Sequence, residues 1–380
     1  MTYWQGINPF HYAPAAREFD VLNLSVGLDE VRRNIGHAHI PTIYPPGAQM
    51  VFQMGTFLGP SQTAMRLTMI VGDLFAICVL WKLASRLKQN PCCAALYAFL
   101  PLSILESSVG GHVDSVGVLC LLFTAYMMSC QRAWLAGLGM ALAGGIKLVP
   151  LALLPKFYYS KRRFFIGVIG TVLVIFGVWY FQYQTYPKGL VAYAHKWRGN
   201  DGLFALFNGG FSFVLHDTVD WINSGTTVRN LITILIGRDH GALVTIEHVS
   251  FAASKLLAIG AVGSAILWAT LYARDISSCW LIFMGCLLLT SPIVHPWYLL
   301  WVAPFASLYA SNLNPWFSRG LITWCLLIWI AYLPRPKYLV TGVWEEQPIL
   351  RLVQYFPVWT CILFGLYEVL KQRTSPGERH

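Results

Sequence analysis

Charged side chains are scarce in this sequence. They make up 12% of the 380 residues, and acidic residues are the rarer kind, with 17 Asp and Glu against 27 Lys and Arg. A soluble domain carries about 25% charged residues, so too little polar surface remains to cover a body that faces water. The composition therefore excludes a soluble globular protein.

Motifs for redox chemistry, metal binding and secretion are also missing. None of the nine cysteines forms a CxxC pair, and most, such as Cys78 and Cys286, lie within apolar runs, where cysteine acts as a small hydrophobic residue. We therefore expect neither a zinc site nor a redox motif, and no cofactor; metal dependence stays open, because no ligand cluster with clear spacing appears. The first residues lack the basic and apolar regions of a signal peptide.

The sequence contains long apolar runs. It is 56% hydrophobic, its mean hydropathy is +0.54, and a helix needs about 17–25 apolar residues to cross a bilayer. We predict an all-α polytopic membrane protein with about nine transmembrane helices plus re-entrant or interfacial segments. The expected spans are 62–84, 92–108, 114–130, 164–184, 251–272, 279–294, 297–311, 319–334 and 350–370.

Basic residues predict the orientation. The net charge of +10 is spread over short loops beside the apolar runs, which excludes a nucleic-acid partner and places those loops in the cytoplasm. The apolar stretch 133–155 has Arg132 and Lys156 at its ends. We expect a re-entrant hairpin folded near Gly144-Gly145, the alternative being a misplaced neighbouring span. Lys147 lies in this stretch and needs a partner or a route to water; we favour a side chain that reaches the cytoplasmic edge, the alternative being a functional role with a partner.

Five parts follow from this topology. They are an extracytoplasmic N-terminal loop with an interfacial helix (1–61), a first membrane bundle with the re-entrant stretch 133–155 (62–184), an extracytoplasmic loop with short helices on the membrane surface (185–250), a second membrane bundle (251–370) and a cytoplasmic tail (371–380).

The first candidate site lies at the outer mouth of two adjacent spans. Glu106, His112 and Asp114 gather there, and charged residues at membrane depth are costly and usually mark function. A carboxylate in this place suits a general base for a substrate hydroxyl, with His112 as its hydrogen-bond partner. The alternative is a polar cap, with Asp114 or Ser115 beginning the next helix.

The second candidate lies where the chain turns between two later spans. His295 stands between two prolines and is followed by Trp297 and Tyr298. These residue types suit binding of a phosphate or stacking on a sugar face. The alternative is an aromatic anchor at the membrane interface, where Trp and Tyr are enriched.

The third candidate lies in the long outer loop. Lys196 and Arg198 are suited to phosphate binding, Arg through its bidentate donors, and Trp197, Asn200 and Asp201 are typical of sugar contacts. The alternative is an ordinary loop whose turns come from glycines and Asn200.

Six motifs in order resemble the C-type glycosyltransferase superfamily, and bacterial polyprenyl-phosphate-mannose-type mannosyltransferases most of all. They are GINPFHYAP (6–14), IPTIYPPGAQMVF (40–52), LESSVGGHVDS (105–115), GGIKLVPLALLP (144–155), KWRGNDGLFALFNGG (196–210) and SPIVHPWYLLWVAPF (291–305). Each motif alone is weakly specific, but the six cover most of the chain.

The resemblance implies an inverting hexosyltransferase, with mannose as the sugar. The donor would be a polyprenyl-phosphate sugar whose tail lies in membrane lipid, and the acceptor a glycan or glycolipid, at the extracytoplasmic face of a bacterial plasma membrane. Asp114, Glu106 and His112 would then be catalytic. Lys196, Trp197, Arg198, Asn200, Asp201, His295, Trp297 and Tyr298 would bind substrate.

One part of the family pattern does not match. Such enzymes have a first span followed by an acidic motif, and neither precedes Tyr3-Trp4-Gln5-Gly6 here. We expect the true start to lie upstream; the alternatives are that Asp114 replaces the missing base, or that this chain is inactive. Two other functions also stay open, a transporter or flippase of lipid-linked sugar and a non-catalytic assembly subunit.

Overall fold

The computed structural model describes residues 6–20, 26–157, 162–183, 189–190, 193, 198–312 and 315–374. Its helices in chain order are η1 (Arg17–Phe19), α1 (Val26–Arg33), α2 (Pro46–Thr56), α3 (Gln62–Arg86), α4 (Cys93–Ala98), α5 (Pro101–Ser103), η2 (Ile104–Val109), α6 (Asp114–Ser129), α7 (Ala133–Ile146), η3 (Val149–Phe157), α8 (Arg162–Tyr183), α10 (Leu203–Val214), η4 (His216–Thr218), α11 (Val219–Ser224), α12 (Thr226–Ile236), α13 (Ile246–Tyr272), α14 (Ile276–Thr290), η5 (Pro296–Trp301), α15 (Ala303–Tyr309), α16 (Trp316–Leu327), η6 (Ile328–Tyr332), α17 (Arg335–Thr341) and α18 (Pro348–Thr374). Within these residues the fold is all-α, which confirms the expected class.

Several helices are long and apolar enough to cross a membrane. Among the described residues four do so alone, namely α3, α13, α16 with η6 and α17 taken together, and α18. A fifth would be the pair Pro101–Val109 and Asp114–Ser129, whose two parts meet at a bend of 119°. The protein is therefore an all-α membrane protein, but the expected number of about nine spans is not supported.

Proline and irregular turns explain the difference. The expected span 92–108 is divided at Pro101 and ends in a π-helical turn, η2. The span expected at 279–294 is a helix of 15 residues that ends at Thr290, before Pro292. The span expected at 297–311 is a 3-10 turn followed by the seven-residue α15. Hydropathy alone does not detect such breaks, because they leave the run apolar.

Glycines let α7 approach α8 and α2 closely. A Cβ at Gly137 of α7 would lie 2.0 Å from the carbonyl oxygen of Phe164, and one at Gly167 of α8 would lie 2.1 Å from that of Trp134. Gly47 in the first turn of α2 meets Gly145 in the last turn of α7, where a Cβ would lie 2.6 Å from backbone. Small residues at such contacts are typical of membrane helix packing, and the last contact lies one residue before the end of α7.

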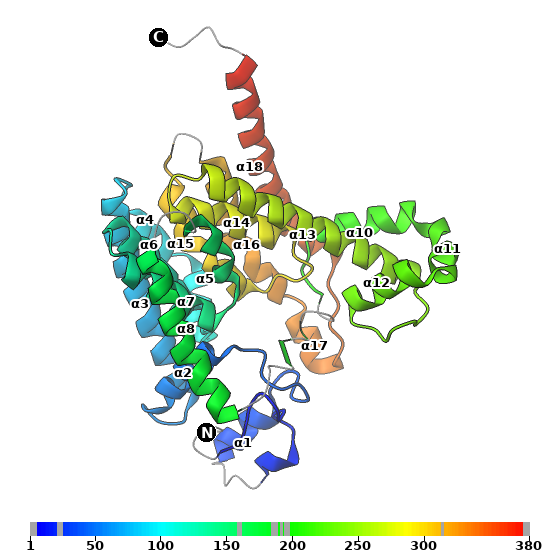
Figure 1. The fold of residues 1–380 in the computed structure, drawn as a ribbon, viewed down its shortest axis with the longest axis horizontal. Coiled ribbons are helices and arrows are strands. Elements are labelled where there is room, and N and C mark those ends of the chain that lie inside the picture. Colours follow the sequence, from blue (N-terminus) through cyan, green and yellow to red (C-terminus); the bar gives the residue numbers. More distant parts are fainter. Residues whose placement is uncertain are drawn as a thin grey trace.

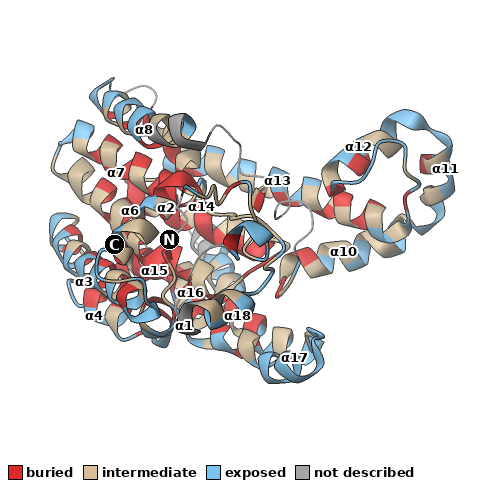
Figure 2. Cartoon of the chain, turned by 90° about the horizontal axis from the view of Figure 1, so that it is seen from below, coloured by how far each residue is buried: buried red, intermediate tan, exposed pale blue. Residues whose placement is uncertain are grey.

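The main core is formed jointly by α3, α6, α7, α14, α15 and α16 and contains three fully buried indoles, Trp280, Trp301 and Trp324. A second, smaller core includes Ile222, Ile232 and Val249. It belongs to α11, α12 and the start of α13, which with α10 form an arm that projects from the body (Figure 1). Buried residues concentrate in the body, whereas the arm has few buried residues and is otherwise intermediate or exposed (Figure 2).

Candidate functional site

Asp114 lies at the centre of the candidate site. It is the first residue of α6, and only 2% of it is exposed. Its Oδ1 atom accepts hydrogen bonds from the Nζ of Lys147, at 2.8 Å, and from the Nε1 of Trp301, at 2.5 Å. The carboxylate is thus held by an ammonium group and an indole from two segments distant in sequence.

Local backbone features bring these donors to Asp114. Helix α7 ends at Ile146, and Lys147 follows in an extended conformation. Gly117 leaves room for the indole, because a Cβ there would lie 2.4 Å from the ring of Trp301. The expectation that Lys147 reaches the cytoplasmic edge is wrong, since the buried carboxylate of Asp114 binds its ammonium instead.

Tyrosines surround this ion pair. The Nζ of Lys147 lies 3.8 Å from the ring centre of Tyr298, whose hydroxyl contacts that of Tyr193. Burial, with the charge of Asp114 as a smaller cause, raises the pKa of Tyr44 above its ordinary value. Burial likewise raises the pKa of Tyr193 to about 12. Tyr44 and Tyr193 therefore stay protonated at neutral pH, as hydrogen-bonding groups.

Three rings form a stack beside the ion pair. The ring centre of His112 lies 4.1 Å from that of Trp297 at an angle of 14°, and the ring centre of His295 lies 4.3 Å from that of Trp297 at 8°. The indole of Trp297 therefore already has two stacking partners within the protein.

Glu106 contacts the ring stack through His112 and is itself buried. It lies in the π-helical turn η2 and is 3% exposed. Its Oε2 lies 3.3 Å from the Nε2 of His112, and its oxygens accept from the hydroxyl of Tyr332 at 3.0 and 3.2 Å. Gly111, in the left-handed region at φ +66°, makes the turn that brings His112 back over Glu106.

Both histidines of the stack are uncharged at neutral pH. Burial lowers the pKa of His295 to about 3, and the nearby charge of Lys147 lowers it further. Burial also lowers the pKa of His112, although the negative charge of Asp114 opposes this effect. Neutral imidazoles can each accept and donate one hydrogen bond, so they suit orientation of a polar substrate.

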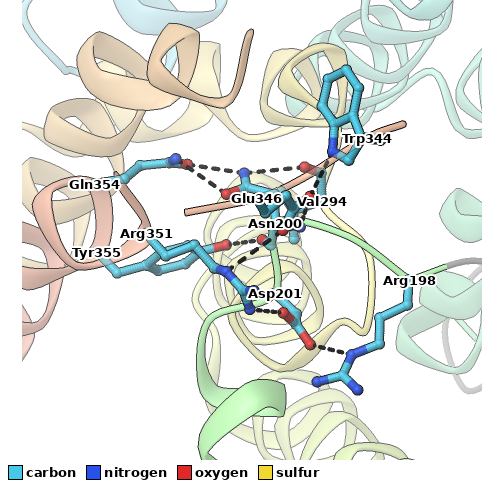
Figure 3. A network of polar contacts seen from close by, with 9 residues as sticks. All are labelled: Arg198, Asn200, Asp201, Val294, Trp344, Glu346, Arg351, Gln354 and Tyr355. Atoms are coloured by element: carbon cyan, nitrogen blue, oxygen red, sulfur yellow. Dashed lines mark hydrogen bonds and ion pairs between the residues drawn. The ribbon is translucent and has the colours of Figure 1, made fainter. Parts of the chain in front are cut away.

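Residues of the third candidate site form a separate network (Figure 3). Asp201 accepts from the Nε of Arg198 at 2.8 Å and from Arg351 at 2.5 Å. Asn200 bonds to Gln354 of α18, and both Asn200 and Asp201 are buried. Lys196 and Trp197 lie outside the described residues. The structure thus brings Asp114, Glu106, His112, His295, Trp297 and Tyr298 together, with Asn200 and Asp201 one layer away.

Some partners at this site were not expected from the sequence. Trp301 lies in an apolar run that gives no sign of a polar role, and Arg351 and Gln354 lie in an expected span. No group of three or more His, Cys, Asp or Glu side chains in the described part of the chain is placed to hold a metal ion. The site offers a carboxylate, an ammonium, two neutral imidazoles and phenol hydroxyls, which suit proton transfer and binding of polar or anionic groups.

Comparison with known proteins identifies the family. No curated protein matches the chain. The model of glycosyltransferase family 87 matches residues 42–292, more than half of the chain, and this stretch contains both Asp114 and Lys147. An enzyme that transfers a sugar was expected from the six motifs, and the match confirms that expectation: the chain belongs to glycosyltransferase family 87.

Proposed function

We propose that this enzyme transfers a hexose, mannose by the resemblance of its motifs, from a polyprenyl-phosphate-linked donor to a glycan or glycolipid acceptor. The transfer inverts the anomeric centre and takes place at the extracytoplasmic face of a bacterial plasma membrane. Family membership supports the transfer, and the apolar helices support a donor held by lipid.

The observation that carries the proposal is the pairing of Asp114 with Lys147. Both donors to this carboxylate bind Oδ1, so we assign Oδ2 to the incoming acceptor hydroxyl. A carboxylate within hydrogen-bond reach of that hydroxyl acts as general base. The neighbouring ammonium is suited to developing negative charge on a departing phosphate.

In the proposed transfer one bond to the anomeric carbon forms and another breaks. The acceptor oxygen attacks the anomeric carbon, and its proton passes to Asp114. The bond between the anomeric carbon and the phosphate oxygen breaks with its electron pair, and polyprenyl phosphate leaves. Lys147 and the hydroxyls of Tyr44 and Tyr193 stabilise its charge. Attack on the face opposite the leaving group inverts the anomeric configuration.

Glu106 and His112 have an orienting role in this proposal. The contact between the two side chains fixes which nitrogen of His112 carries the proton, as a second hydrogen-bonding group does for histidines in general. His295 is the second imidazole that stacks on Trp297, and we assign it to the polar part of the donor. Trp297 holds the two imidazoles parallel and is not itself a sugar platform.

A direct test compares two isosteric carboxylate variants. Asp114→Asn should lower transfer from mannosyl polyprenyl phosphate by about 100-fold or more. Asp73→Asn is the control, since Asp73 is also buried, at 8% exposed, but its carboxylate accepts from Tyr97 rather than from Lys147, and it should stay near the wild-type rate. Membranes containing the full-length protein are assayed, and the product anomer is read by NMR.

Two results would contradict the proposal. An unchanged rate in both Asp114→Asn and His295→Ala would remove the assigned site. Transfer from a sugar nucleotide in membranes depleted of polyprenyl phosphate would remove the assigned donor. Parallel assays with glucosyl polyprenyl phosphate decide whether mannose is the preferred hexose.

A further inference from the structure

The segment that carries His295 and Trp297 is fastened by the loop at 198–201. The backbone N–H of Gly199 donates to the carbonyl of Pro292, and that of Val294 donates to the carbonyl of Gly199, both at 3.0 Å. The Nδ2 of Asn200 adds a bond of 3.2 Å to the carbonyl of Val294, the residue before His295. Three hydrogen bonds therefore hold the segment 292–294, which leads into the ring stack.

Asn200 is held in turn by the last long helix, α18. Its side-chain amide exchanges two hydrogen bonds with that of Gln354, at 3.0 and 3.1 Å. Its backbone carbonyl accepts from the hydroxyl of Tyr355 at 2.6 Å. Figure 3 shows Asn200 between Gln354 and Tyr355 on one side and Val294 on the other. The amide thus links a helix and a loop that are distant in sequence.

Charged groups hold the same loop as well. The N–H of Asn200 donates to both oxygens of Glu346 at 2.8 Å. Asp201, 2% exposed, joins Arg198 to Arg351 of α18. These contacts are internal, so Asn200 and Asp201 are already bound within the protein.

The residue type suits this place for a backbone reason as well. Asn200 has φ +48°, in the left-handed region, where Asn is tolerated far better than most residues. It is 7% exposed, and its amide donates to two acceptors while its oxygen accepts from a third group. A buried amide with its partners satisfied holds one geometry, because each lost bond leaves an unpaired polar group.

We propose that Asn200 is a positioning residue: it sets the place of His295 and Trp297 and links them to α18 through Gln354. It contacts no substrate. The effect on sugar transfer rests on the proposed function, but the positioning itself rests only on the contacts above.

The test removes the amide without disturbing the backbone. Asn200→Gly keeps the left-handed conformation, and Gln354→Met keeps the volume while removing the partner amide. The control is Trp316→Phe, which removes the bond from Trp316 of α16 to Glu368 of α18. It breaks a contact between the two helices that Trp324 and Gln354 also join, but at the other end.

The readout is the exposure of His295 itself. Its Nε2 atom is buried, so diethyl pyrocarbonate should modify it slowly in the wild type. Peptide mass spectrometry gives the rate relative to His216, whose side chain is 76% exposed. We expect modification of His295 to rise about tenfold to a hundredfold in Asn200→Gly and Gln354→Met, as loss of two or three hydrogen bonds implies, and to stay unchanged in Trp316→Phe.

The outcomes separate the two proposals. If both variants fold with wild-type melting temperatures and His295 stays protected, Asn200 does not position it and the inference is overturned. If Trp316→Phe exposes His295 equally, the effect is general loosening of α18, which also overturns it. A rise confined to the two variants supports it, even if the wild type fails to transfer sugar and the proposed function falls.

Discussion

The ammonium of Lys147 lies 2.8 Å from a carboxylate oxygen of Asp114, at the point where α7 ends and α6 begins. Asp114 is almost fully buried, and the side chain of Lys147 is 26% exposed. The carboxylate of Asp114 is therefore shielded from water, whereas part of the Lys147 side chain is accessible to it. In the proposed mechanism that asymmetry leaves the ammonium available to an incoming phosphate.

The first prediction breaks this pair. Lys147→Met should destabilise the folded protein by about 1–3 kcal/mol, because it leaves a buried acceptor without its charged donor. The double variant Lys147→Met with Asp114→Asn should lose less than the two single changes added together. Denaturant unfolding in detergent measures both. Strict additivity would show that the two side chains do not interact.

The polar positions of the first candidate site could be predicted because they are neighbours in the sequence. Glu106, His112 and Asp114 follow one another within nine residues, and polar groups between two apolar runs must meet at one membrane edge. Their partners could not be predicted. Trp301 is hidden in an apolar run, and Lys147 was misassigned because its local flanks say nothing of a carboxylate 33 residues earlier.

The same limit applies to the outer loop. Asn200 and Asp201 have the residue types of sugar contacts, but their partners on α18 lie about 150 residues later in the chain. Length of apolar run was also a poor guide to helix count, since Pro101 and the 3-10 turn at Pro296–Trp301 break the helix without adding polarity. Helical class followed from composition, whereas breaks and long-range pairs depend on tertiary packing.

The second prediction concerns the close contact between α2 and the last turn of α7. Gly47→Ala should push α2 away from Gly145, because the new Cβ would lie 2.6 Å from its backbone. Overpacking of this kind costs about 1–3 kcal/mol, and the shift of Lys147 should lower transfer as well. Gly170→Ala is the control, as nothing lies within 4 Å of its Cβ position. Equal melting temperatures and rates in both variants would rule out this contact as a constraint.

The third prediction concerns acid stability. His295 has a pKa of about 3 in the folded protein against 6.5 ordinarily, because it is buried and Lys147, His112 and His37 lie near it, while Asp114 opposes the shift. Below pH 6.5 the unfolded chain therefore binds a proton that the folded chain does not, so stability falls as pH falls towards 3. Unfolding midpoints from pH 7.5 to 5 should drop less in His295→Gln than in the wild type. If the unfolding midpoints of the two proteins fell in parallel, the low pKa assigned to His295 would be contradicted.

The last prediction concerns the arm formed by α10, α11 and α12. Its outward side chains include Phe213, 88% exposed, and Trp221, 69% exposed, and α12 is apolar on both faces, with Ile232 inside and Ile234 outside. A surface helix in water would present polar residues outward. We therefore propose that the arm rests on the bilayer surface, with its aromatic side chains among the lipid headgroups.

Spin labels in a cysteine-free background test this placement in liposomes. A label at position 213 or 221 should collide more with oxygen than with a water-soluble nickel complex, because oxygen concentrates in lipid. A label at Asp239, exposed in the loop after α12, is the matched control and should show the reverse. If all three positions favour the nickel complex, the arm faces water and the proposed placement is wrong.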